Sequence, residues 1–282
     1  MAVHGAELPP YRALLVVDIR DFSGIPGVHH AKITDLVPVV LNTVFERCGL
    51  DKYWNSRLFG FSTGDGYVVG LHTGVLPRLL NPFLRVLQSE LAYRAEVAAD
   101  PVPLHMRVTV HVGPVTDSGQ ELASDGSGVA RVEAHRLLDA TPVRDLLTRS
   151  GPSTHVAAIV SGRAYHDAVA SGYANEPADL YVQVPVKVKT YSDLAYLRVP
   201  VPTGDLLGRG FLPPAEPEAA TAVEPAAGTT TNTAQHVHGK VVQAGRDVAQ
   251  THNNNYTFHQ AENVNTGSGD QINGVRDHRG PR

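Results

Sequence analysis

An ordered alternation of strand-like and helix-like stretches fills the first 200 residues and constrains the fold more than any other feature. Beyond about Pro200, Pro, Ala, Gly and Thr dominate and the hydrophobic periodicity disappears. A chain of 282 residues with 42% hydrophobic composition can build one good-sized core and a less ordered appendage. We therefore expect a folded domain over residues 1–200, a Pro/Ala-rich linker over 201–228 and a tail over 229–282.

The order of the expected elements indicates the fold class. An Asp-Gly pair between two β-rich runs, as at Asp65, is a strong hairpin signal. Pro38 should kink the first helix, and Pro142 should interrupt the third. The expected elements are a buried strand at 13–19, a helix at 31–50, a hairpin around 64–66, a helix at 75–97, a strand at 105–113, an interrupted helix at 128–150 and strands at 154–161 and 181–199. This β-α-β-β-α-β order predicts a ferredoxin-like α+β domain with a mostly antiparallel sheet backed by helices.

Charge and cysteine content argue against several classes of protein. The net charge of −4 creates no general attraction for nucleic acids or membranes. The one cysteine, Cys48, cannot form an intrachain disulfide or support a Cys-rich zinc site. The first residues lack the pattern of a signal peptide, and no apolar run approaches the roughly 20 residues of a membrane span. We expect a cytoplasmic protein that binds neither nucleic acid nor membranes.

Two carboxylates occupy positions where buried strands end. Asp18 closes the apolar run "LLVV", and Asp65 lies in the hairpin turn. Neighbouring strands lie about 5 Å apart, so the two side chains can converge, where they repel each other unless a cation lies between them. Mg²⁺ and Mn²⁺ commonly bind to such carboxylates together with substrate phosphates. The alternative is that Asp18 caps a loop and Asp65 fills a turn position that favours Asp.

Five segments, in order, resemble the class III nucleotide cyclases over residues 10 to 200. "VVDIRDFSG" resembles the Asp-x-x-x-Phe-Ser opening of that family, and "STGDGYVVG" resembles its Gly-Asp-Gly hairpin. "RVTVHVGPV" is similar to the strand that follows, "DGSGVARVEAHRLL" to the helix that bears Asn and Arg, and "VKVKTYSDLAYLRV" to the last hairpin with its phosphate-contacting Lys. The resemblance implies an enzyme that converts a nucleoside triphosphate into a 3′,5′-cyclic nucleotide and pyrophosphate.

The resemblance also implies a metal site for two ions, in an active site shared across a head-to-tail homodimer. Asp18 and Asp65, with Ile19 beside the first, would hold Mg²⁺ or Mn²⁺. Phe22 and Ser23 belong to the loop whose amides would cradle the triphosphate.

Basic residues complete the implied substrate site. Arg136 takes the place of the family's transition-state arginine. Lys189, or Lys187 two residues before it, would neutralise the terminal phosphates. The alternative for each is a solvated surface charge.

The chain departs from the family at positions that read the base and the ribose. Phe61 replaces a base-reading Lys and cannot donate a hydrogen bond. Val132 replaces the ribose-orienting Asn, and Glu133 or His135 would have to compensate, although both point elsewhere on a regular helix. Asp125 keeps the position of a base-contacting Asp. Two interpretations remain: a cyclase for UTP or CTP rather than a purine, as in bacterial antiphage systems, or a catalytically degenerate module that binds a nucleotide or acts as a scaffold.

The tail carries a short β-prone segment. Its polar composition predicts disorder, because little apolar surface is present to offset the entropy of ordering. "HGKVVQAGRDV", within residues 236–250, resembles bacterial amyloid signalling motifs, which are similar to RIP homotypic interaction motifs. This resemblance implies a partner with a matching motif that gathers and activates the N-terminal domains. Deletion of residues 229–282 would test this role of the tail. Activation by a partner that survives the deletion would contradict it.

Overall fold

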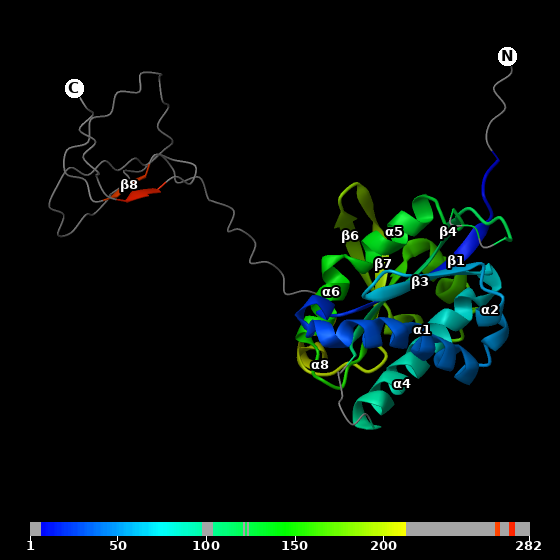
Figure 1. Ribbon diagram of the computed structural model, residues 1–282, viewed down its shortest axis with the longest axis horizontal. Coiled ribbons are helices and arrows are strands. Elements are labelled where there is room, and N and C mark those ends of the chain that lie inside the picture. The colour runs from blue at the N-terminus through cyan, green and yellow to red at the C-terminus, as the bar shows by residue number, and fades with distance from the viewer. Residues whose placement is uncertain are drawn as a thin grey trace, which may run out of the picture. The chain divides into compact units, whose positions relative to one another are not determined.

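A computed structural model describes residues 7–97, 104–120, 122, 124–212, 263–265 and 271–273 (Figure 1). The chain divides into two units, Met1–Glu216 and Pro217–Arg282. In the second unit, β8 (Asn263–Asn265) pairs with β9 (Gln271–Asn273) in antiparallel fashion. The linker beyond Leu212 and the amyloid-like segment at 236–250 lie outside the described residues.

The first unit is built on a seven-stranded sheet with the order β2-β3-β1-β4-β5-β7-β6. All neighbouring pairs are antiparallel except β4 and β5, which are parallel. The strands are β1 (Tyr11–Ile19), β2 (Phe59–Ser62), β3 (Gly66–Leu71), β4 (Met106–Pro114), β5 (Val156–Ser161), β6 (Val182–Val188) and β7 (Tyr191–Arg198). The βαββαβ order over β1 to β4 and the mostly antiparallel sheet confirm the predicted α+β fold.

Helices cover both faces of this sheet. Figure 1 shows α1 (His30–Arg47) and α4 (Leu84–Val97) on one side and α5 (Val129–Leu138) on the other. The remaining helices are α2 (Asp51–Asn55), α3 (Leu76–Arg78), α6 (Thr141–Arg149), α7 (Gly162–Tyr165) and α8 (Asp205–Arg209), with shorter turns at Phe22–Gly24, Gly27–His29, Thr73–Val75, Leu79–Phe83, His166–Ala170 and Ala178–Leu180. Because both faces are covered, β1 is a continuous apolar run rather than an alternating one.

The side chains of β1 alternate between two cores. Leu15 and Val17 join the large cluster that includes α1 and α4, whereas Leu14 and Val16 join the smaller cluster beneath α5. Strand periodicity places Asp18 on the same face as Leu14 and Val16. The acid at the end of the strand therefore belongs to the α5 side of the sheet.

The prediction of one continuous helix over residues 75–97 is wrong, because the chain leaves helical geometry at Asn81. Asn81 has φ −142° and ψ 118°, which separates the turns around α3 from α4. Pro82 explains the break, because the residue before a proline is disfavoured in helical geometry. The Asn81 amide donates to the carbonyls of Ala174 and Asn175 at 3.2 and 3.1 Å. In contrast, α1 runs through Pro38 as one helix.

The folded unit continues past the expected boundary at residue 200. Leu206 of α8 is buried with the cluster that contains the apolar face of α6. Arg149 donates to the carbonyl oxygens of Gly210 and Phe211 at 3.1 and 2.7 Å. These contacts place residues 201–211 in the first unit. No helix in the described parts of the chain has the length and apolar character of a membrane span.

Candidate functional site

A cavity of about 280 Å³ opens where β1 ends. Its walls come from the loop after β1, the β2–β3 turn, β4 and α6. The lining residues are Ile19, Arg20, Asp21, Phe22, Ser23, Asp65, Arg107, Arg144 and Thr148. Three guanidinium groups and two carboxylates thus surround one small space.

Asp18 lies behind this lining, bound to Arg107. The two residues are direct cross-strand partners, and Asp18 also lies opposite Gly66 of β3. Arg107 Nε donates to Asp18 Oδ1 at 2.7 Å, and Nη2 donates to Oδ2, a bidentate pair. A side chain at Gly66 would collide with the carbonyl oxygen of Val17, so glycine is required for this close approach.

The electrostatics of Asp18 favour a positive charge beside it. Its exposed fraction is 8%, and burial raises its pKa from 3.8 to about 6, against the opposing effect of Arg107. The negative charge of Asp65 contributes to the same rise in pKa. Asp65 is held in place through its backbone, because its carbonyl oxygen accepts from Ile19 N at 2.9 Å. The structure thus brings Asp18, Ile19 and Asp65 together, and their role in binding metal stays a prediction.

The donor set fits a divalent cation bound through two carboxylates. No cluster of three or more His, Cys, Asp or Glu side chains with metal-binding geometry occurs within the described ranges. A cation here would therefore need oxygens from a substrate as well, which is the usual arrangement for Mg²⁺. It would also have to compete with Arg107 for the oxygens of Asp18.

The loop after β1 is tied to α6. Asp21 adopts a left-handed conformation with φ 55°, which turns the chain at the cavity. Arg20 Nη1 donates to Leu147 O at 2.6 Å, and Arg20 Nε donates to Asp21 at 2.9 Å. Phe22 stacks on His30 with ring centroids 4.3 Å apart, and Phe22 and Ser23 both line the cavity.

Arg136 and Lys189 lie together but outside the cavity lining. Arg136 Nη1, on α5, donates to Thr190 Oγ1 at 2.8 Å. Lys189, beside Thr190 in the β6–β7 turn, is exposed and has φ 55°. Lys187 is exposed on β6. Within one copy of the chain, Arg136 and the β6–β7 turn form a second group, outside the lining of the cavity beside the acids.

Phe61 contacts α5 from β2, at the opposite edge of the sheet from β6 and its lysines. The guanidinium of Arg131 lies over the Phe61 ring, 5.2 Å from its centroid. Val132 is 48% exposed on the same helix. Glu133 turns inward, with Oε2 3.4 Å from His111 Nε2, and burial raises its pKa. Burial likewise lowers the pKa of His135.

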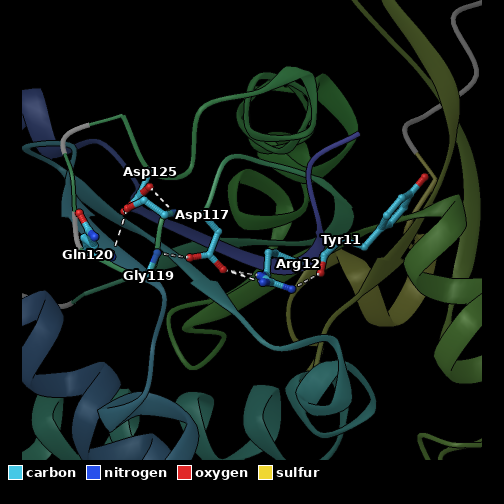
Figure 2. A network of polar contacts seen from close by, with 7 residues as sticks. Tyr11, Arg12, Asp117, Gly119, Gln120 and Asp125 are labelled. Carbon is cyan, nitrogen blue, oxygen red and sulfur yellow. Dashed lines mark hydrogen bonds and ion pairs between the residues drawn. The ribbon is translucent and has the colours of Figure 1, made fainter. Parts of the chain in front are cut away.

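The carboxylate of Asp125 accepts hydrogen bonds from residues of its own loop. It accepts hydrogen bonds from Ser118 N, Ser118 Oγ and Leu122 N, each at 2.8 Å. The bonds from Ser118 lower its pKa. Figure 2 shows Asp125 beside Asp117, which accepts from Gly119 and from Arg12 of β1. A base contact by Asp125 would have to share oxygens that already order this loop.

Sequence reasoning assigned no role to the side chains of five cavity residues: Arg20, Asp21, Arg107, Arg144 and Thr148. For Arg107 a signal existed, because Met106 and Val108 face one core, so a charged residue between them must find a partner on the other face. For Arg144 and Thr148 the local pattern shows only the polar side of an amphipathic helix.

No family model and no curated protein matches the chain. Solved structures of cyclases are similar to it. The adenylate/guanylate cyclase/hydrolase from Silicibacter pomeroyi is 16% identical with a TM-score of 0.45, over 68% of this chain and 98% of that one. The guanylate cyclase domain of RhGC from Catenaria anguillulae, in complex with GTP, is 14% identical with a TM-score of 0.44, over 69% and 98%.

A third similar structure is that of adenylate cyclases from Trypanosoma brucei in their monomeric state. It is 12% identical, with a TM-score of 0.42, over 67% of this chain and 89% of that one. Likenesses this distant assign no activity. The function of this protein therefore has to be inferred from the side chains that line and adjoin its cavity.

Proposed function

We propose that this protein is a divalent-metal-dependent nucleotide cyclase, which converts a nucleoside triphosphate into a 3′,5′-cyclic nucleotide and pyrophosphate. The observation that carries the proposal is the convergence of Asp18 and Asp65 beside a cavity lined by three arginines. Paired carboxylates suit a cation, and arginines suit a polyphosphate. Both features in one space of about 280 Å³ match a metal–triphosphate substrate.

In the proposed reaction, the ribose 3′-oxygen attacks the α-phosphorus, and the bond from that phosphorus to the bridging oxygen of the β-phosphate breaks. The hydroxyl proton goes to solvent, and pyrophosphate leaves with the bonding electrons. Bound Mg²⁺ or Mn²⁺ supplies acidity to the 3′-hydroxyl and neutralises phosphate charge. Asp18 and Asp65 bind the cation, while Arg20 and Arg107 surround the phosphates with positive charge.

A second copy of the chain completes the site in this proposal. Arg136 lies outside the cavity of its own copy, where it donates to Thr190 beside Lys189. In a head-to-tail homodimer, the α5 surface of one copy would face the cavity of the other. Arg136 would then stabilise charge developing on phosphorus, and Lys189 would contact phosphate oxygens.

The choice of base follows from Phe61. Its ring lies beneath the Arg131 guanidinium and offers stacking rather than hydrogen-bond donors. We favour a pyrimidine substrate, UTP or CTP, in bacterial signalling or antiphage defence. Turnover of ATP or GTP alone would refute the pyrimidine preference.

A second candidate function is a nucleotide-binding or scaffold module without turnover. Arg107 favours it, because its bidentate pair occupies both oxygens of Asp18 and supplies the positive charge that this carboxylate needs. The two candidates differ in whether product forms.

A turnover assay separates them. Purified full-length protein is incubated with Mn²⁺ and ATP, GTP, CTP or UTP in turn, and products are identified by mass spectrometry. We expect one cyclic nucleotide, and a loss of at least about 100-fold for Asp65→Asn, because the cation loses a charged ligand. Asp35→Asn, an exposed change on α1, should retain activity. Absence of product from all four substrates would favour the binding module.

A further inference from the structure

The outer face of α6 forms one wall of the cavity. Val143, Leu146 and Leu147 are buried in the cluster with β5, β6 and β7, which fixes the inner face of the helix. Arg144 and Thr148, four residues apart, lie on the opposite side and line the cavity. A helix far along the chain from both acids thus contributes directly to their site.

Hydrogen bonds at its C-terminal end hold the backbone of this helix in place. Arg20 Nη1 and Ser150 Oγ both donate to Leu147 O, at 2.6 and 2.9 Å. Arg149 donates to the carbonyls of Gly210 and Phe211. The position of Arg144 is therefore set by a packed element that is bonded to the loop after β1.

Of the three arginines that line the cavity, Arg144 is the one whose guanidinium makes no ion pair or hydrogen bond with the described residues. Arg107 is bound to Asp18, and Arg20 is bound to Asp21 and Leu147. Within the described residues, the Arg144 guanidinium has neither an ion pair nor a hydrogen bond. Thr148 directs its hydroxyl proton to the Arg144 carbonyl at 3.2 Å, which leaves the guanidinium as the donor on this face of α6.

We propose that Arg144 binds the terminal phosphates of the substrate, in the same copy of the chain that supplies Asp18 and Asp65. This inference rests on the proposed function and deepens it. A guanidinium presents a planar pair of donors that fits two phosphate oxygens. A cation held by Asp18 and Asp65 would act at the reacting α-phosphate, so we assign the wall formed by α6 to the part of the substrate that leaves as pyrophosphate.

The assignment predicts a particular selectivity. Inorganic pyrophosphate and the nucleoside triphosphate should both depend on Arg144, whereas the cyclic product, which lacks the terminal phosphates, should not. In steady-state kinetics, loss of Arg144 should raise KM more than it lowers kcat, because the group binds substrate and does not act on the reacting bond.

Calorimetric titration of the full-length protein with pyrophosphate, with and without Mn²⁺, tests this directly. We expect Arg144→Ala to weaken binding about tenfold, and Arg144→Lys to recover part of the loss by restoring the charge without the fork. Arg85→Ala, an exposed change on α4 away from the cavity, is the matched control and should bind as wild type. Circular dichroism checks that each variant is folded.

The outcomes separate this inference from the proposed function. Equal pyrophosphate affinity in wild type and Arg144→Ala, with cyclase turnover intact, overturns the role of Arg144 and leaves the function standing. Equal losses in Arg144→Ala and Arg85→Ala also overturn it, because they would reflect overall charge. No pyrophosphate binding and no turnover by the wild type would overturn both.

Discussion

His111, on β4 beneath α5, is a buried histidine whose ring has no hydrogen-bond partner among the described residues. Neither ring nitrogen has one among the described groups, and the nearest carboxylate oxygen, on Glu133, lies 3.4 Å from Nε2. Burial lowers its pKa from 6.5 to about 4; Arg163 lowers it too, and Asp193 acts in the opposite direction. The folded protein therefore keeps this ring neutral where an unfolded chain would protonate it.

We predict that His111 makes the fold less stable as pH falls from about 6.5 to about 4. In that window the unfolded chain binds a proton that the folded chain does not, so the free energy of unfolding falls by up to about 1.4 kcal/mol per pH unit. Urea denaturation at pH 7 and pH 5 measures the effect. His111→Gln should lose less stability than wild type over this range, whereas the exposed control His72→Gln should follow wild type. Equal pH dependence in all three proteins would contradict the prediction.

At the scale of elements, Gln88 joins α4 to the start of β5. It is 3% exposed, and its Oε1 accepts from the backbone N–H groups of His155 and Val156 at 2.8 and 2.9 Å. Its Nε2 donates to Ser153 O at 2.9 Å. One side chain therefore satisfies backbone groups where the strand begins.

We predict that Gln88→Leu lowers the free energy of unfolding by about 2–4 kcal/mol, because two buried N–H groups lose their acceptor. Urea denaturation at pH 7 measures the change. Gln183→Leu, an exposed substitution on β6, is the matched control and should change stability little. A loss below about 1 kcal/mol for Gln88→Leu would mean that the backbone finds other partners.

Local sequence patterns predict some elements of the fold. The β2–β3 turn follows from Asp65-Gly66, and β4 from period-two alternation. The break at Asn81 was missed, although Pro82 marks it, because the apolar spacing continues across it.

In the candidate site, too, the residues marked by a local sequence pattern could be predicted and those placed by tertiary packing could not. Asp18 and Asp65 could be placed together, because Asp18 ends an apolar strand run, Asp65 lies in an Asp-Gly hairpin turn, and neighbouring strands lie about 5 Å apart. Arg144 could not, because the bond from Arg20 to Leu147 that sets α6 beside the loop joins residues 127 apart in sequence. Contacts over such separations depend on tertiary packing and leave no short-range pattern.

At the scale of the whole molecule, the first unit contains two groups of proposed site residues that do not meet in one copy. The acids line or adjoin the cavity, while Arg136 contacts the β6–β7 turn. A C₂ dimer would bring the groups together twice, forming two equivalent sites. The activating role of residues 236–250 remains a prediction from sequence.

Complementation between two inactive variants tests most directly whether each active site is shared between two copies of the chain. Asp65→Asn and Arg136→Ala should each lose nearly all turnover alone. If each site takes its acids from one copy and Arg136 from the other, an equal mixture that exchanges subunits should recover about a quarter of wild-type activity, because half of the dimers are mixed and each has one intact site. A mixture that stays as inactive as its components, beside an active wild type and with subunit exchange verified, would contradict the shared site.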